Sequence, residues 1–230
     1  MAQIISILGN KGGTGKTTMS HMLGHGFGLL GLRAVVAVTD TTRDPLSKQG
    51  RRYLPADART PEQLAKIART LQSVDGWIGI IDGGAGRQDF DDRLAALSQV
   101  VLLPFRESHE DIRTVKKDLA RLPQAFAVPS QWPTNAWALE AANRTVQTLM
   151  SEFRDRILPP VFAIGASKLL LQVELPAVLP SALNVACRGL ARHVALLAGI
   201  EVPDDQPPIA RQDASSTRVP RPGSLVPAAC

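Results

Sequence analysis

Cysteine is scarce in this 230-residue sequence, which holds only Cys187 and Cys230 and no CxxC pair. The two residues lie far apart, so the sequence supports neither a disulfide framework nor a zinc or iron–sulfur site. Long apolar runs are also missing: no window approaches about 18 uninterrupted apolar residues, and no basic stretch with a long apolar run follows Met1. We therefore expect a soluble, cytoplasmic protein that is not exported and does not bind a membrane.

The composition that remains is typical of one globular domain. The chain is 44% hydrophobic and 20% charged, which is enough to bury a sizeable core. Its 26 basic and 21 acidic residues give a net charge of +5, which favours polyanionic partners such as nucleic acid. Proline and small polar residues dominate from Glu201 onward, so we expect a single domain over residues 1–200 and a tail without its own core over residues 201–230.

Apolar segments alternate with helical segments along the chain. Apolar or β-branched runs predict strands over residues 4–8, 34–38, 77–81, 100–103 and 161–164. Helices are predicted over residues 17–30 and 135–153, after the capping residues Thr60 and Ser108, and in a last segment that ends at Gly199. The helix after Thr60 is expected to carry Leu64, Ile67, Leu71 and Val74 on one face. Strands buried on both faces and interleaved with helices predict an α/β fold with a doubly wound, mostly parallel sheet flanked by helices.

The stretch GNKGGTGKTT lies between the first predicted strand and the first predicted helix. It misses the strict phosphate-loop pattern, G-x-x-x-x-G-K followed by Ser or Thr, because Asn10 stands where that pattern has glycine. In such a setting, the backbone N–H groups of residues 12–16 and the positive end of the helix surround a β-phosphate. Lys16 is then predicted to bridge the β- and γ-phosphates and Thr17 to hold magnesium. A glycine-rich turn with a chance GKT is the alternative.

Written as KGGTGKTT, the same stretch resembles the loop of the ParA/MinD family of deviant Walker A ATPases, which reads KGGxGK followed by two Ser or Thr residues. The resemblance covers roughly residues 1–122 clearly and the rest faintly, and it implies a P-loop NTPase fold that binds ATP and Mg²⁺. In the family the first lysine, here Lys11, reaches across a face-to-face dimer to the phosphates of the other subunit; otherwise it is a surface lysine. The predicted nucleotide-binding residues are Lys11, Gly12, Gly13, Thr14, Gly15, Lys16, Thr17 and Thr18.

Two aspartates follow predicted strands at the distances that the family shows. Asp40, in VVAVTD, matches the hydrolytic aspartate and is expected to orient the attacking water near magnesium, with Asp44 as the alternative. Asp82, in WIGIID, matches the Walker B aspartate that holds magnesium through water. The resemblance thus implies Lys11, Lys16 and Asp40 as catalytic residues and the metal-binding residues Thr17, Asp40 and Asp82.

The sequence also departs from the family around these aspartates. Val38 stands where many members have a further aspartate, and residues 83–86 read Gly-Gly-Ala-Gly where the family commonly has Thr-Pro-Pro-Gly. Residues 83–86 are either a switch that senses the γ-phosphate or a plain turn. Nucleotide binding is therefore expected, while the rate of hydrolysis stays open.

Positive charge gathers on the helix predicted after Ser108. The spacing of Arg113, Lys117 and Arg121 places three cations along one stripe of that helix. Such a stripe suits sequence-independent contact with a phosphate backbone, although a solvated helix face is the alternative. The candidate DNA-contacting residues are Arg113, Lys116, Lys117, Arg121, Arg188 and Arg192.

The resemblance implies a ParA-like ATPase whose slow hydrolysis is stimulated by a small partner protein. Such an enzyme forms an ATP-dependent sandwich dimer, binds DNA nonspecifically and drives partition or positioning of a plasmid, a chromosome or another cargo, so we expect it on the nucleoid when ATP is bound. The alternative is a MinD-like or conjugation-associated ATP-gated scaffold with little hydrolysis. The proline-rich tail disfavours a membrane-binding helix, and the cysteine positions disfavour a nitrogenase-type reductase. No motif separates ATP from GTP.

Overall fold

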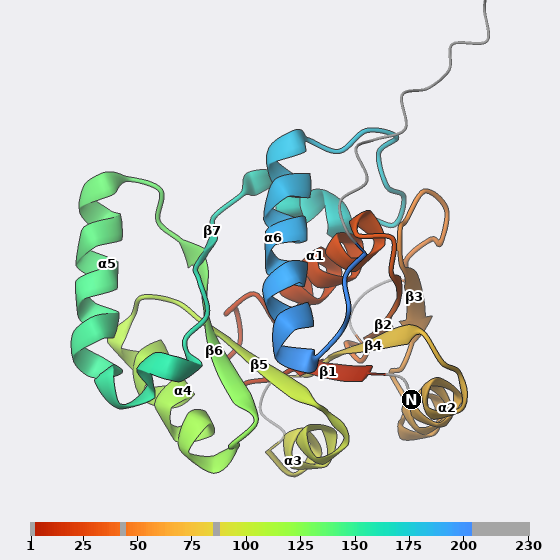
Figure 1. Ribbon diagram of the computed structural model, residues 1–230, viewed down its shortest axis with the longest axis horizontal. Helices are drawn as coiled ribbons and strands as arrows, with labels where there is room; N and C mark the ends of the chain where they lie inside the picture. Colours follow the sequence, from red (N-terminus) through yellow and green to blue (C-terminus); the bar gives the residue numbers. More distant parts are fainter. Residues whose placement is uncertain (1–2, 42–44, 85–87, 204–230) are drawn as a thin grey trace, which may run out of the picture.

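A computed structural model describes residues 3–41, 45–84 and 88–203 of the chain (Figure 1). Its centre is a sheet of seven strands in the order β3-β2-β4-β1-β5-β6-β7, and every neighbouring pair is parallel. The strands are β1 (Gln3–Ile7), β2 (Arg33–Val38), β3 (Leu54–Asp57), β4 (Trp77–Asp82), β5 (Val100–Phe105), β6 (Ala125–Trp132) and β7 (Val161–Phe162).

Helices cover both faces of this sheet (Figure 1). They are α1 (Lys16–Leu29), α2 (Pro61–Ser73), α3 (Gln88–Leu97), α4 (His109–Arg121), α5 (Ala136–Leu149) and α6 (Ser181–Ala198), with 3-10 helices η1 (Ser151–Arg156) and η2 (Gly165–Leu171). Ile5 and Ile7 of β1 pack in the cluster with α1 and α6, whereas Ile4 packs in the cluster with α2 to α5. Because successive strand residues point to opposite faces, β1 is buried on both sides. The predicted doubly wound α/β fold is confirmed.

Capping residues begin two of the helices where the sequence predicts. Thr60 Oγ1 accepts from the Gln63 N–H at 3.3 Å and Gln63 Oε1 accepts from the Thr60 N–H at 3.1 Å, which is a complete capping box at α2. Ser108 Oγ accepts from the Asp111 N–H at 3.1 Å at α4. The prediction that Val74 shares a helix face with Leu64, Ile67 and Leu71 is wrong: α2 ends at Ser73, and Val74 is an extended C-cap that is 39% exposed.

Two strands and one α-helix, β3, β6 and α3, have no counterpart in the sequence prediction. Strand β3 has the sequence LPAD and lies at the edge of the sheet, where a proline is tolerated. Strand β6 contains Pro129 and the polar pair Ser130 and Gln131, which interrupt its apolar run. Helix α3 begins with QDFDD, in which Phe90 is the single apolar residue, so the sequence pattern does not reveal an apolar helix face. The helix predicted over residues 135–153 ends earlier, because the chain turns at Met150 into η1.

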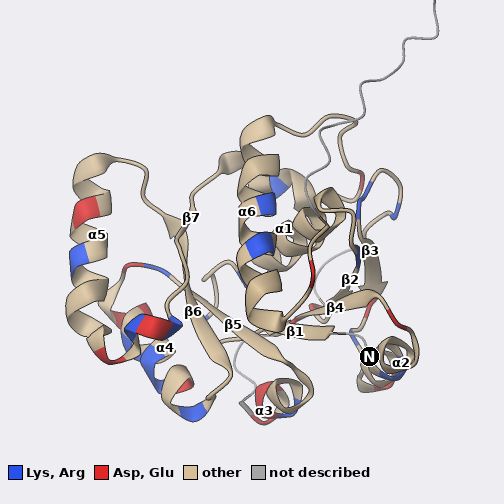
Figure 2. Cartoon of the chain, in the orientation of Figure 1, with Lys and Arg blue, Asp and Glu red and all other residues tan. Residues whose placement is uncertain are grey.

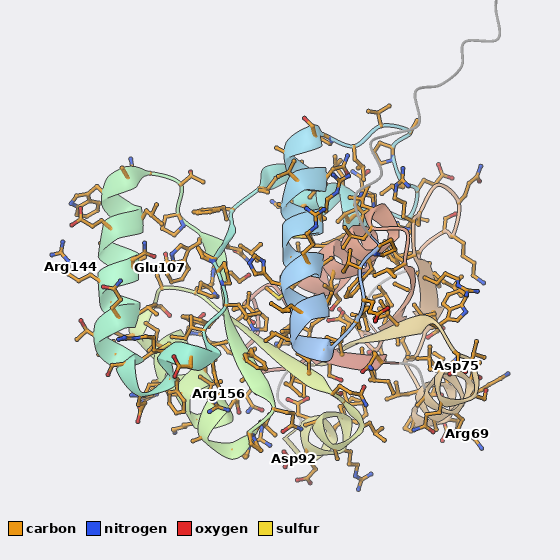
Figure 3. The ribbon with its side chains drawn as sticks, in the orientation of Figure 1. Arg69, Asp75, Asp92, Glu107, Arg144 and Arg156 are labelled. Carbon is orange, nitrogen blue, oxygen red and sulfur yellow. The ribbon has the colours of Figure 1, made fainter. Side chains whose placement is uncertain are left out.

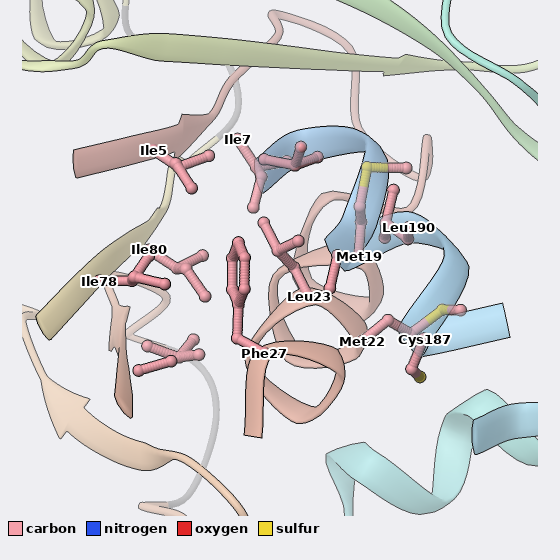
Figure 4. Close-up of a cluster of buried hydrophobic side chains, with 14 of the residues drawn as sticks. Ile5, Ile7, Met19, Met22, Leu23, Phe27, Ile78, Ile80, Cys187 and Leu190 are labelled. Carbon is pink, nitrogen blue, oxygen red and sulfur yellow. The ribbon is translucent and has the colours of Figure 1, made fainter. Parts of the chain in front are cut away.

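Helix α1 is buried between the sheet and α6 (Figure 4). Its side chains Met19, Leu23 and Phe27 are each at most 2% exposed. Glycine lets the two helices approach closely, because a Cβ at Gly26 would lie 2.1 Å from the carbonyl oxygen of Cys187 on α6. The helix that follows the phosphate loop is therefore fixed by the last helix of the domain.

The structure also bears on cysteine chemistry and membrane crossing. Cys187 is buried and is not part of a disulfide, and burial raises the pKa of its thiol to about 12. Cys230 lies outside the described residues, as do Asp44 and residues 204–230 of the predicted tail. Within the described ranges, no helix has both the length and the apolar character that crossing a membrane requires.

Candidate functional site

A pocket of about 520 Å³ opens at the carboxyl edge of the sheet. This edge is where open α/β sheets bind ligands. The segments after β1, β2 and β4 meet Gln131 of β6 there. The pocket is lined by Gly12, Gly13, Gly15, Lys16, Thr17, Thr18, Thr39, Asp40, Thr41, Asp82, Gly83, Gly84 and Gln131. Sequence segments as distant as the phosphate loop and β6 thus form one cavity.

The glycine loop exposes the start of α1 to this pocket. Gly13 has φ +77° and Gly15 has φ +97°, both in the left-handed region that favours glycine. Gly15 is the N-cap of α1, and no side chain caps the helix. The first backbone N–H groups of α1 are therefore available to a ligand. The positive end of the helix dipole adds to these donors. The loop therefore presents an anion-binding concavity of the kind that phosphate requires.

Lys16 lies within the loop and is 8% exposed. Its Nζ donates to the carbonyl oxygen of Lys11 at 2.7 Å. Burial lowers the pKa of Lys16, while the charges of Asp82, Asp91 and Asp118 oppose that shift. Lys16 thus supplies a partly desolvated cation beside the glycine N–H groups.

Lys11 points to helix α4 and does not line the pocket. Its Nζ lies 2.5 Å from Asp111 Oδ1 and 2.9 Å from Glu110 Oε2. The hydrogen bond to Asp111 raises the pKa of Lys11 most, and the hydrogen bond to Glu110 raises it further. The two lysines of the loop therefore have different surroundings: Lys16 belongs to the pocket, and Lys11 is held at the start of α4.

The three predicted metal-binding residues line the same pocket. Asp82 is 2% exposed, and its Oδ1 accepts from Ser20 Oγ of α1 at 3.1 Å. Its backbone oxygen accepts from Thr39 Oγ1 at 2.6 Å, which ties the ends of β2 and β4 together. Carboxylate and hydroxyl oxygens suit magnesium, which keeps several waters and substrate phosphates as its other ligands. Among the described residues, no group of three or more His, Cys, Asp or Glu side chains is placed to hold a metal ion alone.

Gln131 is a pocket residue that the sequence analysis did not find. It has φ +54°, which is uncommon for a residue other than glycine. Its Nε2 donates to the Gly13 carbonyl at 3.5 Å, and its Oε1 accepts from Arg106 Nη2 at 2.9 Å. The positive φ marks a constrained position beside the loop. Only the recognition of β6 in the sequence could have placed this residue at the site.

The six candidate DNA-contacting residues do not form one surface. Helix α4 packs on one face of the sheet and α6 on the other, so the two groups are separated (Figure 2). On α4, Lys116 pairs with Glu152 and Arg121 pairs with Asp92 and Asp118. Arg113 and Lys117 are exposed, and no ion pair joins them to another described residue. Arg188 is half-buried on α6, and Arg192 is exposed there.

A buried carboxyl group lies near the loop on α3. Asp91 is 1% exposed, and neither of its side-chain oxygens has a hydrogen-bond partner among the described residues. Burial raises its pKa from 3.8 to about 6; the Asp118 charge adds to this increase, and the Lys16 charge opposes it. The folded protein therefore takes up a proton at a higher pH than the unfolded chain does, and the cost of burying the charge is fully present only above about pH 6.

Asp91→Asn should stabilise the protein at about pH 7.5, because it removes this cost. One pKa unit corresponds to about 1.4 kcal/mol, so the free energy of unfolding should rise by at most about 3 kcal/mol. The gain should shrink as the pH falls through 6 and be mostly lost at about pH 4, where Asp91 is protonated in the folded protein and partly protonated in the unfolded chain. Urea unfolding at both pH values measures it, with Asp92→Asn as the exposed control. An equal gain at both pH values would contradict this explanation.

The strand, glycine loop and helix, together with the aspartate at the end of β4, define the P-loop NTPase fold. Neither a protein-family model nor a curated protein matches the sequence significantly. Solved structures do match, and they share the fold of the ParA/MinD type of deviant Walker A ATPases. The septum site-determining protein MinD from Pyrococcus horikoshii with Mg-ADP is 20% identical, with a TM-score of 0.59 over 86% of this chain and 98% of that one.

Two further structures extend this likeness. McdA from Cyanothece, in a complex with ATP, is 14% identical with a TM-score of 0.58, over 87% of this chain and 97% of McdA. A candidate plasmid partition protein from Borrelia burgdorferi, bound to AMPPNP, is 12% identical with a TM-score of 0.57, over 85% of this chain and 99% of that protein. At these identities the comparisons establish the fold, and the function must be inferred from the site.

Proposed function

We propose that this protein is a ParA/MinD-like ATPase that binds ATP with Mg²⁺ and hydrolyses it slowly. The observation that carries the proposal is the single pocket that joins the glycine loop, Thr17, Asp40 and Asp82 at the carboxyl edge of the sheet. Proteins of the same fold hold ATP or Mg-ADP. We propose ATP and not GTP as the nucleotide, because these structures of the same fold hold adenine nucleotides.

Each pocket residue has a role in this proposal. Lys16 and the N–H groups of the loop bind the β- and γ-phosphates, because both a cation and a helix N-terminus favour these anions. Thr17 and Asp82 hold Mg²⁺, and the Ser20 hydroxyl orients the Asp82 carboxylate for this contact. When bound, Mg²⁺ would neutralise part of the negative charge of the phosphates. Asp40 orients the attacking water.

A second copy of the chain completes the proposed enzyme. Lys11 is the residue that we assign to the partner's phosphates, and the contacts with Asp111 and Glu110 hold it at the start of α4 until then. A dimer formed on ATP binding then exposes two copies of each basic group to DNA. Arg113 and Lys117 of α4 and Arg192 of α6 are the exposed cations among the candidates.

The proposed activity is partition or positioning of DNA or another cargo. It involves nonspecific DNA binding, a small partner protein that stimulates hydrolysis, and a cytoplasmic location on the nucleoid in the ATP state. Residues 1–200 form the proposed ATPase domain, and the proline-rich segment 201–230 follows it. The second candidate is an ATP-gated scaffold with little hydrolysis, which Val38 and the Gly83-Gly84 pair favour because they replace family residues beside the pocket.

Asp40→Ala should lower the rate of ATP hydrolysis by about 100-fold, the size expected for loss of a group that orients the reacting water. Binding of Mg-ATP should change by less than about threefold, since Lys16 and the loop remain. A phosphate-release assay with calorimetry measures both quantities. Asp57→Ala is the control, because Asp57 ends the neighbouring strand β3 and pairs with Arg59.

The outcomes of this assay separate the two candidate functions and test the role of Asp40. Turnover that is lost in Asp40→Ala and kept in Asp57→Ala supports the ATPase. A parent protein that binds ATP without turnover above background supports the scaffold. Equal turnover in Asp40→Ala and the parent would show that Asp40 has no part in hydrolysis.

A further inference from the structure

Asn10 joins the phosphate loop to helix α4. Its Nδ2 donates to Asp118 Oδ1 at 3.0 Å, although the two residues are 108 positions apart in the sequence. Asp118 is 4% exposed. A buried carboxylate is costly unless hydrogen bonds satisfy it, so this contact strongly constrains where Asn10 can lie.

Asp118 is itself held in place from a second side. Arg121 Nη2 donates to Asp118 Oδ1 at 3.2 Å, and the same guanidinium pairs with Asp92 of α3. Figure 3 labels Asp92 on α3. Burial raises the pKa of Asp118, while the hydrogen bonds from Asn10 and the charge of Lys16 oppose that shift. The carboxylate is thus a fixed acceptor between two helices and the loop.

The next residues connect this acceptor to the phosphate-binding lysine. Gly9 has φ +136°, a conformation that other residues rarely adopt, so a glycine is required where the chain enters the loop before Asn10. The carbonyl of Lys11, the residue after Asn10, accepts from Lys16 Nζ at 2.7 Å. Contacts therefore run without a break from Asp118 through Asn10 and the Lys11 carbonyl to the Lys16 ammonium.

We propose that Asp118 is a positioning residue for the nucleotide: by holding Asn10 it fixes the entry of the phosphate loop and thereby sets the affinity for the triphosphate. This inference rests on the proposed ATP binding and deepens it. It also explains why Asn10 occupies the position where the strict loop pattern has glycine, because glycine has no side chain to reach Asp118.

The acceptor oxygen and the negative charge of Asp118 have opposite effects on phosphate binding. The charge acts against an incoming triphosphate by Coulomb repulsion. The oxygen favours binding because it holds the loop. Asp118→Asn keeps an acceptor oxygen and removes the charge, whereas Asp118→Ala removes both, so the two substitutions separate the effects.

Calorimetric titration of the full chain with Mg-ATP tests the proposal. Asp118→Ala and Asn10→Ala should each weaken binding about tenfold, or about 1.4 kcal/mol. The double variant should be no weaker than either single variant, because both remove the same contact. Asp118→Asn should bind within about twofold of the parent or more tightly. In each alanine variant KM should rise while kcat changes less than about twofold.

Controls separate positioning from loss of folding. Asp92→Asn removes a partner of Arg121 that does not touch the loop, and its ATP affinity should equal that of the parent. Thermal unfolding identifies a variant that does not fold; if Asp118→Ala is one, Asn10→Ala and Asp118→Asn carry the test. A parent that does not bind ATP overturns the proposed function. A parent that binds, with alanine variants that bind equally well or whose losses add, overturns only the positioning role.

Discussion

Lys16→Ala is expected to lower the affinity for Mg-ATP by at least about 100-fold. A hydrogen bond to a charged group contributes about 1.5–3 kcal/mol, and Lys16 is placed to make such bonds to both terminal phosphates. Lys16 is 8% exposed inside the loop. If the lysine is removed, water therefore has little access to solvate the phosphates in its place. The Lys16 Nζ donates to the Lys11 carbonyl, and we expect bound ATP to replace this acceptor. Hydrolysis, dimer formation and DNA binding should all be lost in Lys16→Ala, because each depends on bound ATP.

Isothermal titration calorimetry with Mg-ATP measures this loss. Lys66→Ala is the matched control, because Lys66 is an exposed lysine on α2 outside the pocket. Circular dichroism shows whether Lys16→Ala keeps its fold. If a folded Lys16→Ala protein binds Mg-ATP as the parent does, the pocket is not a triphosphate site and the proposed function is wrong.

Lys11→Ala is expected to abolish ATP-dependent dimerisation while ATP binding by the monomer stays within roughly tenfold. The structure gives the reason for this separation: Lys11 does not line the pocket and is held by Asp111 and Glu110 of α4. A cation that reaches the partner's triphosphate in a water-poor interface offsets the repulsion between two nucleotides. DNA binding should be lost together with the dimer.

Light scattering with ATP and magnesium measures the mass of the Lys11→Ala protein. Lys117→Ala is the control, since it removes an exposed cation of α4 without touching the loop. A full-strength dimer of Lys11→Ala would show that Lys11 is a surface lysine. A loss of ATP binding equal to that of Lys16→Ala would instead show that Lys11 serves its own nucleotide.

The sequence predicts the parts of this molecule that depend on local patterns. The buried strand β5 begins with the continuous apolar run Val100 to Leu103, and Thr60 and Ser108 begin helices through contacts three residues away. The pocket residues of the loop, Asp40 and Asp82 follow from the same local order, because parallel strands bring their carboxyl ends to one edge.

Long-range contacts are what the sequence could not show. The partner of Asn10 lies 108 residues away on α4, and no pattern around Asn10 indicates it. The cationic stripe predicted from Arg113, Lys117 and Arg121 is interrupted for the same reason, because Arg121 pairs with Asp92 of α3. A helical wheel places these cations on one side but cannot show which acids of other elements face them.

The close approach of Gly26 to Cys187 determines when the nucleotide site can form during synthesis. Glycine costs a helix about 1 kcal/mol relative to alanine, and α1 contains three glycines, so α1 has little stability of its own. On the ribosome the loop emerges first, whereas α6 starts at Ser181. A nascent chain that stops before Ser181 carries the entire loop sequence but lacks the helix that holds α1 in place. We therefore expect the proposed nucleotide site to form only after almost the whole domain has been translated.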